Sequence, residues 1–149
     1  MHIPGNIDSL LHQKQPALWS VAPEATVFDA IQLMSDKNIG ALPVMKGEEL
    51  VGMFSERDYT RKVMLKGKSS KTTAVHEIIS LPVISVGRAH SVEECMRLMT
   101  EHRVRHLPVL DGDKLVGIVS IGDLVNWTIS AQNVALTQME DYISGKYPG

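Results

Sequence analysis

Two serine-aspartate pairs with the same spacing are the best candidates for chemistry in this chain. Ser55 and Asp58 lie three residues apart after an apolar run, and Ser120 and Asp123 repeat the arrangement. At a strand-to-helix junction, such a pair combines a hydroxyl, a carboxylate and the free N–H groups of a helix N-terminus. The N–H groups and the serine could hold a phosphate while the aspartate accepts hydrogen bonds from a sugar diol. The same spacing is a helix-capping box, so capping is the alternative, and the two roles can coexist.

The two pairs belong to a longer internal repeat. The segment 52–58 reads GMFSERD and the segment 117–123 reads GIVSIGD, at an offset of 65 residues. The same offset relates the Leu-Pro-Val triplets at 42–44 and 107–109. Because glycine, proline, serine and aspartate all keep this register, we infer a tandem duplication.

Each half of the duplication predicts the order strand, helix, strand, strand, helix. Apolar runs with turn residues between them indicate the strands, and a spacing of three to four residues indicates the helices. In the first half, Thr26 is the expected N-cap of a helix that ends at Asn38 or Gly40. The expected strands are 18–21, 41–45, 49–54, 83–86, 106–110 and 114–119, with helices 26–38 and 91–101 and further helices opening at Ser55 and Ser120. The predicted fold class is α+β, with two β-α-β-β-α units packed face to face around one core.

The segments outside the repeats have apolar faces of their own. The predicted domains are an N-terminal lead-in (1–17), repeat 1 (18–74), repeat 2 (75–128) and a C-terminal helix or tail (129–149). In the lead-in, Ile7, Leu10 and Leu11 form one face that is expected to dock on the core. In the tail, Ile129, Leu136 and Ile143 are seven residues apart, which indicates a docking or dimer helix that ends before Gly145.

Composition narrows the class of protein. The chain of 149 residues has a net charge of −2 and a pI near 6.3, so no broad basic field favours nucleic acid. No apolar run approaches the length of a membrane span, and we expect a soluble, cytoplasmic protein. Cys95 is the only cysteine, which excludes an internal disulfide. It lies on the apolar face of a predicted helix and is expected to be a packed core residue.

These motifs resemble a known family. The repeated glycine-x-x-serine-x-x-aspartate signature, behind a strand-helix-strand-strand unit, is similar to the CBS (cystathionine beta-synthase) domain pair, or Bateman module. The resemblance covers residues 18–127. The segments SERDYTRKV, GKSSK, TEHRVRHLPVLDG, GIVSIGDLV and YISG resemble the small stand-alone CBS-pair proteins in particular.

The resemblance implies two clefts between the repeats that bind adenosine compounds such as AMP, ADP, ATP, NAD or S-adenosylmethionine. By similarity, Asp58 and Asp123 hold the ribose hydroxyls, and Ser55 and Ser120 lie near ribose or phosphate. The other residues that the resemblance assigns to nucleotide binding are Trp19, Ile39, Gly40, Ala41, Met53, Arg57, Val83, Ile84, Val104, Arg105, His106, Pro108 and Ile118.

The two clefts are expected to differ. Basic residues before the proline of the second strand of a repeat often reach phosphate in the family, and repeat 2 has Arg105 and His106 where repeat 1 has Gly40 and Ala41. Arg57 is expected to compensate in the first cleft, which leaves Arg105 and His106 as the basic residues of the second corner.

Three other sequence patterns suggest alternative functions, and each is a weaker indication than the repeated signature. The sequence Gly-Lys-Ser at 67–69 resembles the end of a P-loop, but Lys62 occupies the position of the required glycine. The basic residues Arg61, Lys62, Lys66, Lys68 and Lys71 form either a solvated face or a polyphosphate-binding surface. His102 and His106 are not expected to share one face, so no metal cofactor is predicted.

The predicted function is therefore a homodimeric, ligand-sensing regulatory module and not an enzyme, because no serine elbow, cysteine motif or acid pair marks a catalytic site. The alternative is a protein-interaction module with vestigial clefts, for example a regulator of thioredoxin-like redox proteins. An uncharacterised enzyme is the third hypothesis.

Overall fold

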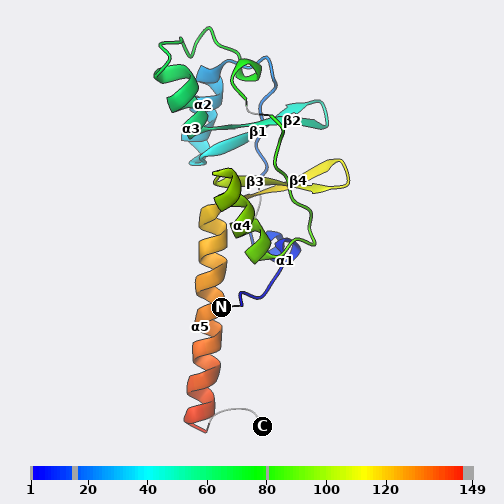
Figure 1. Cartoon of the computed structure of the whole chain (residues 1–149), viewed down its shortest axis with the longest axis vertical. Helices are drawn as coiled ribbons and strands as arrows, with labels where there is room; N and C mark the ends of the chain where they lie inside the picture. Colours follow the sequence, from blue (N-terminus) through cyan, green and yellow to red (C-terminus); the bar gives the residue numbers. More distant parts are fainter. Residues whose placement is uncertain (1, 15–16, 80, 146–149) are drawn as a thin grey trace.

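The structure is a computed structural model that describes residues 2–14, 17–79 and 81–145. Helices surround two antiparallel sheets of two strands each, which confirms the predicted α+β class. The two hairpins lie next to each other between the helices of repeat 1 and those of repeat 2 (Figure 1). The second and fourth strands are in contact, which joins the two halves.

Repeat 1 follows the expected order from its second element onward. Its elements are α2 (Val27–Lys37), β1 (Ala41–Lys46), β2 (Glu49–Ser55), α3 (Glu56–Asp58) and η1 (Tyr59–Met64). The hydroxyl of Thr26 caps α2 by accepting a hydrogen bond from the N–H of Asp29 at 3.1 Å. Asn38 ends the helix in the left-handed conformation, with φ of 54°. Gly47 turns the hairpin with a φ of 64°, a conformation that glycine adopts without strain.

Repeat 2 has the same construction. Its elements are η2 (Val75–Glu77), α4 (Val92–His102), β3 (His106–Asp111), β4 (Lys114–Ser120) and α5 (Ile121–Ile143). Both hairpins have the same register, because Ala41 faces Ser55 in one and His106 faces Ser120 in the other. The duplication inferred from the sequence is thus a duplication of structure.

The first strand predicted in each repeat is not formed. Val21 makes a single parallel bridge to Val44, and Val86 makes a single parallel bridge to Val109. The N–H of Val21 donates to Pro43 O and its carbonyl accepts from Met45 N, so both hydrogen bonds involve one residue. The chain enters a turn at 22–25, before a second residue can pair. A β-prone apolar segment therefore lies along the sheet edge without becoming a strand.

The helix predicted after Ser55 is also irregular. A single α-helical turn, α3, continues into η1, where the N–H of Leu65 donates to the carbonyl of Thr60, five residues back. Such i to i+5 hydrogen bonds widen the helix and are common near functional sites. The matching helix of repeat 2, α5, is regular over 23 residues.

Burial divides into two clusters, so the prediction of one shared core is wrong. The cluster of repeat 1 includes Phe54 and the later residues Val75 and Ile78. The cluster of repeat 2 includes Ile7, Leu10 and Leu11 from α1 (Ile7–Gln13), which confirms that the lead-in docks. The lead-in therefore packs on repeat 2, and the first residues of repeat 2 pack on repeat 1.

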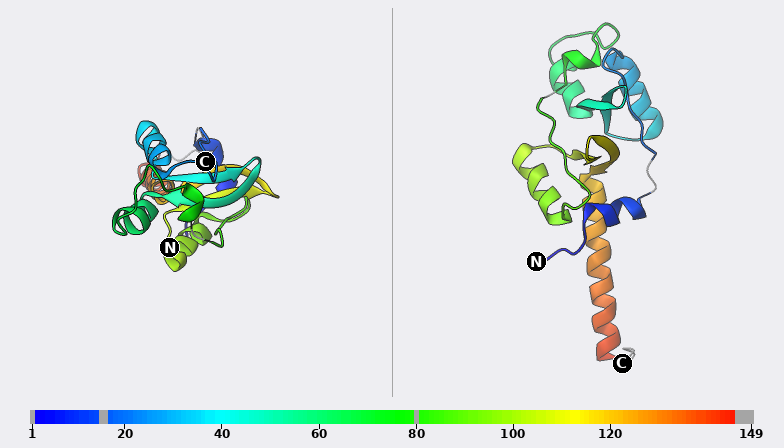
Figure 2. Two further views of the ribbon diagram at one scale, coloured as in Figure 1. Left: turned by 90° about the horizontal axis from the view of Figure 1, so that it is seen from above. Right: turned by 90° about the vertical axis from the view of Figure 1, so that its right-hand side faces the viewer.

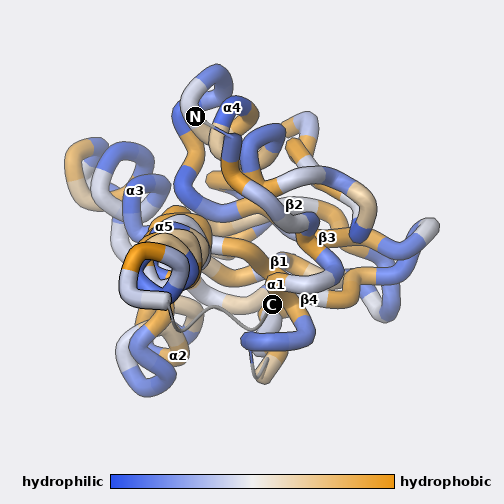
Figure 3. Tube along the Cα trace, turned by 90° about the horizontal axis from the view of Figure 1, so that it is seen from below, coloured by the Kyte–Doolittle hydropathy of each residue, from blue (hydrophilic) through white to orange (hydrophobic). Residues whose placement is uncertain are grey.

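Beyond the two repeats, α5 extends well away from the sheets (Figures 1 and 2). Figure 3 views α5 end-on and shows both hydrophobic and hydrophilic positions around it. The exposed hydrophobic residues of the helix include Val125, Ile129, Val134, Leu136, Met139, Tyr142 and Ile143. After the helix ends at Ile143, Gly145 has a φ of 76°. The described helices include none with the length and apolar character that a membrane span requires.

Candidate functional site

A cavity of about 560 Å³ lies between the two repeats. Repeat 1 contributes the corner where β2 meets α3, and repeat 2 contributes the segment 82–84 and the junction of α4 with β3. We call this cavity the first cleft. The expected nucleotide-binding residues that line it are Gly40, Ala41, Met53, Ser55, Arg57, Asp58, Val83, Ile84, Val104, Arg105 and His106.

In this cleft, Ser55 and Asp58 form a capping box. Asp58 Oδ2 accepts hydrogen bonds from Ser55 N at 2.9 Å and Ser55 Oγ at 3.1 Å, and Asp58 N donates to Ser55 Oγ at 3.2 Å. The other carboxylate oxygen of Asp58, Oδ1, pairs with Lys62 Nζ at 3.2 Å. The capping role is thus present. A ligand that uses Asp58 would share Oδ1 with Lys62 or displace it.

Basic side chains gather in the first cleft. Arg57, Arg61, Lys62, Arg103 and Arg105 line it, against the carboxylates of Glu56 and Asp58. Arg57 Nη1 donates to the carbonyl of Arg103 at 2.9 Å, which links the two repeats. Arg105 and His106 were expected to be the basic residues of the second corner, but they line the same cavity as Arg57. The cause is the crossing of the repeats, which brings the α4–β3 junction of repeat 2 opposite the signature of repeat 1.

His106 lies at the boundary between the two corners. A Cβ added at Gly40 would lie 3.3 Å from His106 Cε1, so the glycine leaves room for the imidazole. His106 is also the β-sheet partner of Ser120. Burial lowers the pKa of His106, the charge of Lys14 lowers it further, and Asp123 partly opposes them. The surroundings of His106 therefore favour the neutral form of its imidazole.

The second corner, formed by Ser120 and Asp123, holds a different partner. Ser120 N donates to Asp123 Oδ2 at 2.8 Å, and Asp123 N donates to Ser120 Oγ at 3.1 Å, which again makes a capping box. Lys14 Nζ lies 2.7 Å from the same Oδ2 and donates to the carbonyl of Ile118, also at 2.7 Å. Sequence reasoning missed Lys14, because no motif relates it to a residue 109 positions away.

Four of the expected nucleotide-binding residues lie outside the first cleft. Trp19 lies against Lys37, whose Nζ is 4.1 Å from the ring centroid. Ile39 lines a separate hollow between α2 and η1. Pro108 is buried in β3, and Ile118 contributes its carbonyl to Lys14. None of these residues lines the first cleft.

The first cleft also contains residues that were not assigned to it. These are Glu56, Arg61, Lys62, Pro82, His102 and Arg103, of which Arg61 and Lys62 had been considered as a possible polyphosphate surface. The internal repeat relates Arg103 to Asn38, 65 residues earlier, and so could have indicated that Arg103 ends a helix. In the structure both residues have the same left-handed φ of 54°. Within the described part of the chain, no three His, Cys, Asp or Glu side chains are grouped to hold a metal ion.

Comparison with known proteins agrees with this architecture. The CBS domain family model matches residues 14–65 and 75–130. A solved structure of a protein with CBS domains from Burkholderia ambifaria is 48% identical, with a TM-score of 0.82, and the match covers 86% of this chain and 96% of that one. The CBS domain pair of the protein MJ0100, solved with 5′-methylthioadenosine and S-adenosylmethionine, is 22% identical with a TM-score of 0.72, covering 82% of this chain and 94% of that one.

A curated relative extends the match to plants. A mitochondrial CBS domain-containing protein of Arabidopsis thaliana is 40% identical over 135 residues. The alignment covers 87% of this chain and 65% of the plant protein. Two domain matches that together cover most of the chain, and a fold with the same two repeats, lead to one conclusion: the chain belongs to the CBS domain family and carries the domain twice.

Proposed function

We propose that this chain is a regulatory module that binds an adenosine nucleotide, such as AMP, ADP, ATP or NAD(H), in its first cleft. Asp58 would accept hydrogen bonds from the ribose hydroxyls. Ser55 and the N-terminal N–H groups of α3 would lie near ribose or phosphate. Binding would change the affinity of the module for a protein partner, and no catalytic step is part of the proposal.

The composition of the first cleft is the observation that carries this proposal. Met53, Val83, Ile84 and Val104 supply apolar contacts for a ring, whereas Arg57, Arg61 and Arg105 supply positive charge for phosphate. The volume of about 560 Å³ is within the range of pockets that take small molecules. The ligands of the MJ0100 pair show that this fold can hold adenosine compounds.

The energetics favour binding of moderate affinity. A charge-assisted hydrogen bond contributes about 1.5 to 3 kcal/mol. Displacing Lys62 from Asp58 costs about 1 kcal/mol or less, because the lysine side chain is 37% exposed and water screens the pair. Two or three contacts of this kind, together with a buried purine, correspond to a dissociation constant of about micromolar order.

Regulation would follow from the position of the cleft between the repeats. A ligand that contacts both the corner at Asp58 and the segment 104–106 favours the arrangement in which the two are close. It can shift a conformational equilibrium only by its differential affinity for the two states. The hydrogen bond from Arg57 to the carbonyl of Arg103 already crosses this boundary and would respond to ligand.

Calorimetric titration tests the proposal directly. Protein stripped of carried-over ligand is titrated with AMP, ATP, NADH and S-adenosylmethionine, beside Asp58→Asn as the matched variant. We expect saturable heat with at least one compound and a weaker response from the variant. No heat with any of the four compounds would refute the assignment.

The exposed face of α5 supports a second candidate, a protein-interaction module whose clefts are vestigial. Leu136, Met139 and Ile143 are each more than half exposed, and such apolar residues favour docking on another chain. The same face supports a homodimer, and a cytoplasmic location belongs to the same proposal. The interaction module predicts that partner capture survives Asp58→Ala with Asp123→Ala and is lost when the segment from Ile129 is removed. Sedimentation at micromolar concentration tests the dimer.

A further inference from the structure

The ammonium group of Lys14 occupies the second corner and contacts the aspartate that a ligand would use. This group lies 2.7 Å from Asp123 Oδ2 and 2.7 Å from the carbonyl oxygen of Ile118. Asp123 is the counterpart of Asp58, the residue proposed to hold the ribose. Since the lysine and aspartate side chains are 33% and 22% exposed, the pair is partly sheltered from water. The acceptor that a sugar diol would need in this corner therefore already has a cationic partner from the same chain.

A docked element, and not a loose terminus, holds Lys14 in this position. Lys14 follows α1 directly, and its N–H donates to the carbonyl of Leu10 at 3.0 Å. Ile7 and Leu10 are buried in the core of repeat 2. The backbone N–H of Ile7 donates to the carbonyl of His90 at 2.9 Å. The lysine therefore starts from a fixed point on the same repeat that carries Asp123.

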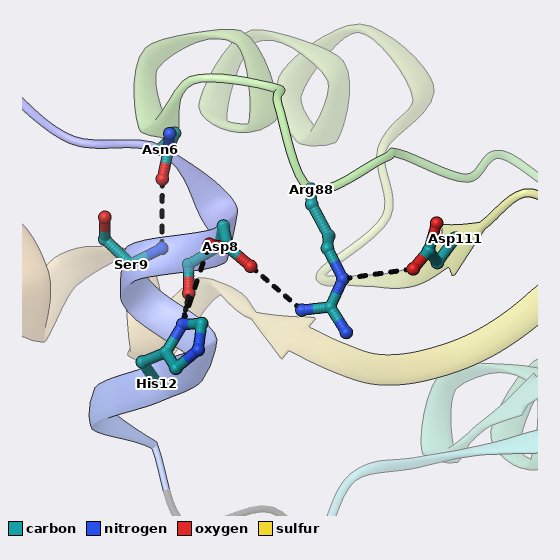
Figure 4. Close-up of polar contacts among 6 residues, drawn as sticks. All are labelled: Asn6, Asp8, Ser9, His12, Arg88 and Asp111. Carbon is teal, nitrogen blue, oxygen red and sulfur yellow. Dashed lines mark hydrogen bonds and ion pairs between the residues drawn. The ribbon is translucent and has the colours of Figure 1, made fainter.

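Ion pairs add to this anchoring. Asp8 of α1 pairs with Arg88 at 2.9 Å, and Arg88 also contacts Asp111 at 3.5 Å (Figure 4). Asn6 caps the helix by accepting a hydrogen bond from Ser9 N at 2.9 Å. Because α1 pairs with Arg88 and packs in the apolar core, these contacts fix the position of its C-terminal end.

The first cleft differs at the position of Lys14, although its aspartate also has a lysine partner. Lys62 Nζ lies 3.2 Å from Asp58 Oδ1 and 3.0 Å from the carbonyl oxygen of Ile78, and both contacts are longer than those of Lys14. A Cβ at Gly117 would lie 2.8 Å from Leu11 Cδ2, and a Cβ at Gly52 would lie 2.6 Å from Ile79 Cδ1. Leu11 therefore packs against the signature glycine of repeat 2 in the same way as Ile79 packs against that of repeat 1. Three residues further on, the chain has Lys14 in one case and Pro82 in the other, and Pro82 lines the first cleft. An uncharged proline replaces the cation that pairs with Asp123.

We propose that Lys14 decides which cleft takes a ligand: it closes the second corner, so that the adenosine ligand enters the first cleft alone. This inference rests on the proposed function. A ligand reaches the second corner only by displacing the Lys14 ammonium from Asp123 and Ile118. Removing the ammonium while keeping the length of the side chain exposes a second aspartate with the same capping geometry as Asp58, and a second site becomes available.

Binding stoichiometry tests the proposal. The full-length wild type, Lys14→Met and the control Lys46→Met, at an exposed hairpin position, are titrated with ATP, AMP and NADH. We expect one ligand per chain for the wild type and the control, and two for Lys14→Met. In the double variant Lys14→Met with Asp58→Asn, the first site weakens and the new site remains. If Lys14→Met still binds one ligand, the proposal is wrong while the proposed function stands. If no protein binds any of the three ligands, both are wrong.

Amine labelling tests the contact without a ligand. Reductive methylation of the folded protein, read by mass spectrometry, reports the reactivity of each lysine. We expect Lys14 to react about two- to fivefold faster in Asp123→Asn than in the wild type, since a partly exposed ion pair protects by about that factor. Lys46 should react equally in both and serves as the internal control. Equal rates at Lys14 in the two proteins would overturn the proposal.

Discussion

Asp58 and Asp123 have the same local structure, so replacing each by asparagine separates capping from ligand binding. Each carboxylate accepts a hydrogen bond from the N–H of its own serine, at 2.9 Å for Ser55 and 2.8 Å for Ser120. Asparagine keeps one oxygen for this bond and loses the ion pair with Lys62 or Lys14. We therefore expect both variants to lose about 1 kcal/mol or less of unfolding free energy.

The two variants should differ in ligand affinity. In the first cleft, Asp58→Asn removes the charge and the acceptor Oδ1 that is offered to the ribose diol, while the remaining oxygen stays in the capping box. The loss of about 1.5 to 3 kcal/mol raises the dissociation constant for ATP about ten- to 150-fold. Asp123→Asn should leave that constant within about twofold, because Lys14 already holds the second corner.

Urea unfolding gives the stabilities, and calorimetric titration gives the affinities, of the same preparations. An equal loss of affinity in the two variants would show that both corners bind, and would refute the distinction between the clefts. An unchanged affinity in Asp58→Asn, with the stability loss present, would show that Asp58 only caps its helix. The wild type measured in parallel fixes the reference for both quantities.

Three further predictions concern single side chains. Arg61→Ala should weaken ATP about three- to tenfold more than adenosine, because a contact to phosphate is lost, and equal losses would contradict this role. Because the pKa of His106 is lowered in the folded state, the unfolded state binds its proton first, and stability falls as the pH drops below about 6.5. Urea unfolding at neutral and acidic pH should show a shallower decline for His106→Gln, and equal slopes would argue against the shift. Burial raises the pKa of Cys95 to about 11 from 9.0, so native iodoacetamide labelling at pH about 8 should be about 100-fold slower than for an exposed thiol.

Local features of the fold could be predicted from the sequence. Thr26 caps α2 as predicted, and Asn38, one of the two predicted ends, terminates it. Gly47 turns the first hairpin between the two predicted strands. These depend on φ preferences and on hydrogen bonds between residues close in the chain, which neighbouring residues determine. The strands at 18–21 and 83–86 were overpredicted, because an apolar, β-prone segment does not reveal how many residues find a partner.

The contents of the candidate site were decided by tertiary packing. The sequence identified both serine-aspartate pairs, and the resemblance supplied most of the residues around them. The sequence analysis assigned Arg105 and His106 to the second corner. In the structure they line the first cleft together with Arg57, because the two repeats cross. Lys14 reaches Asp123 across 109 positions because burial of α1 brings its end there. Periodicity and motif spacing report only near neighbours in the chain, so the repeat could be found from the sequence while the difference between its two corners required the folded structure.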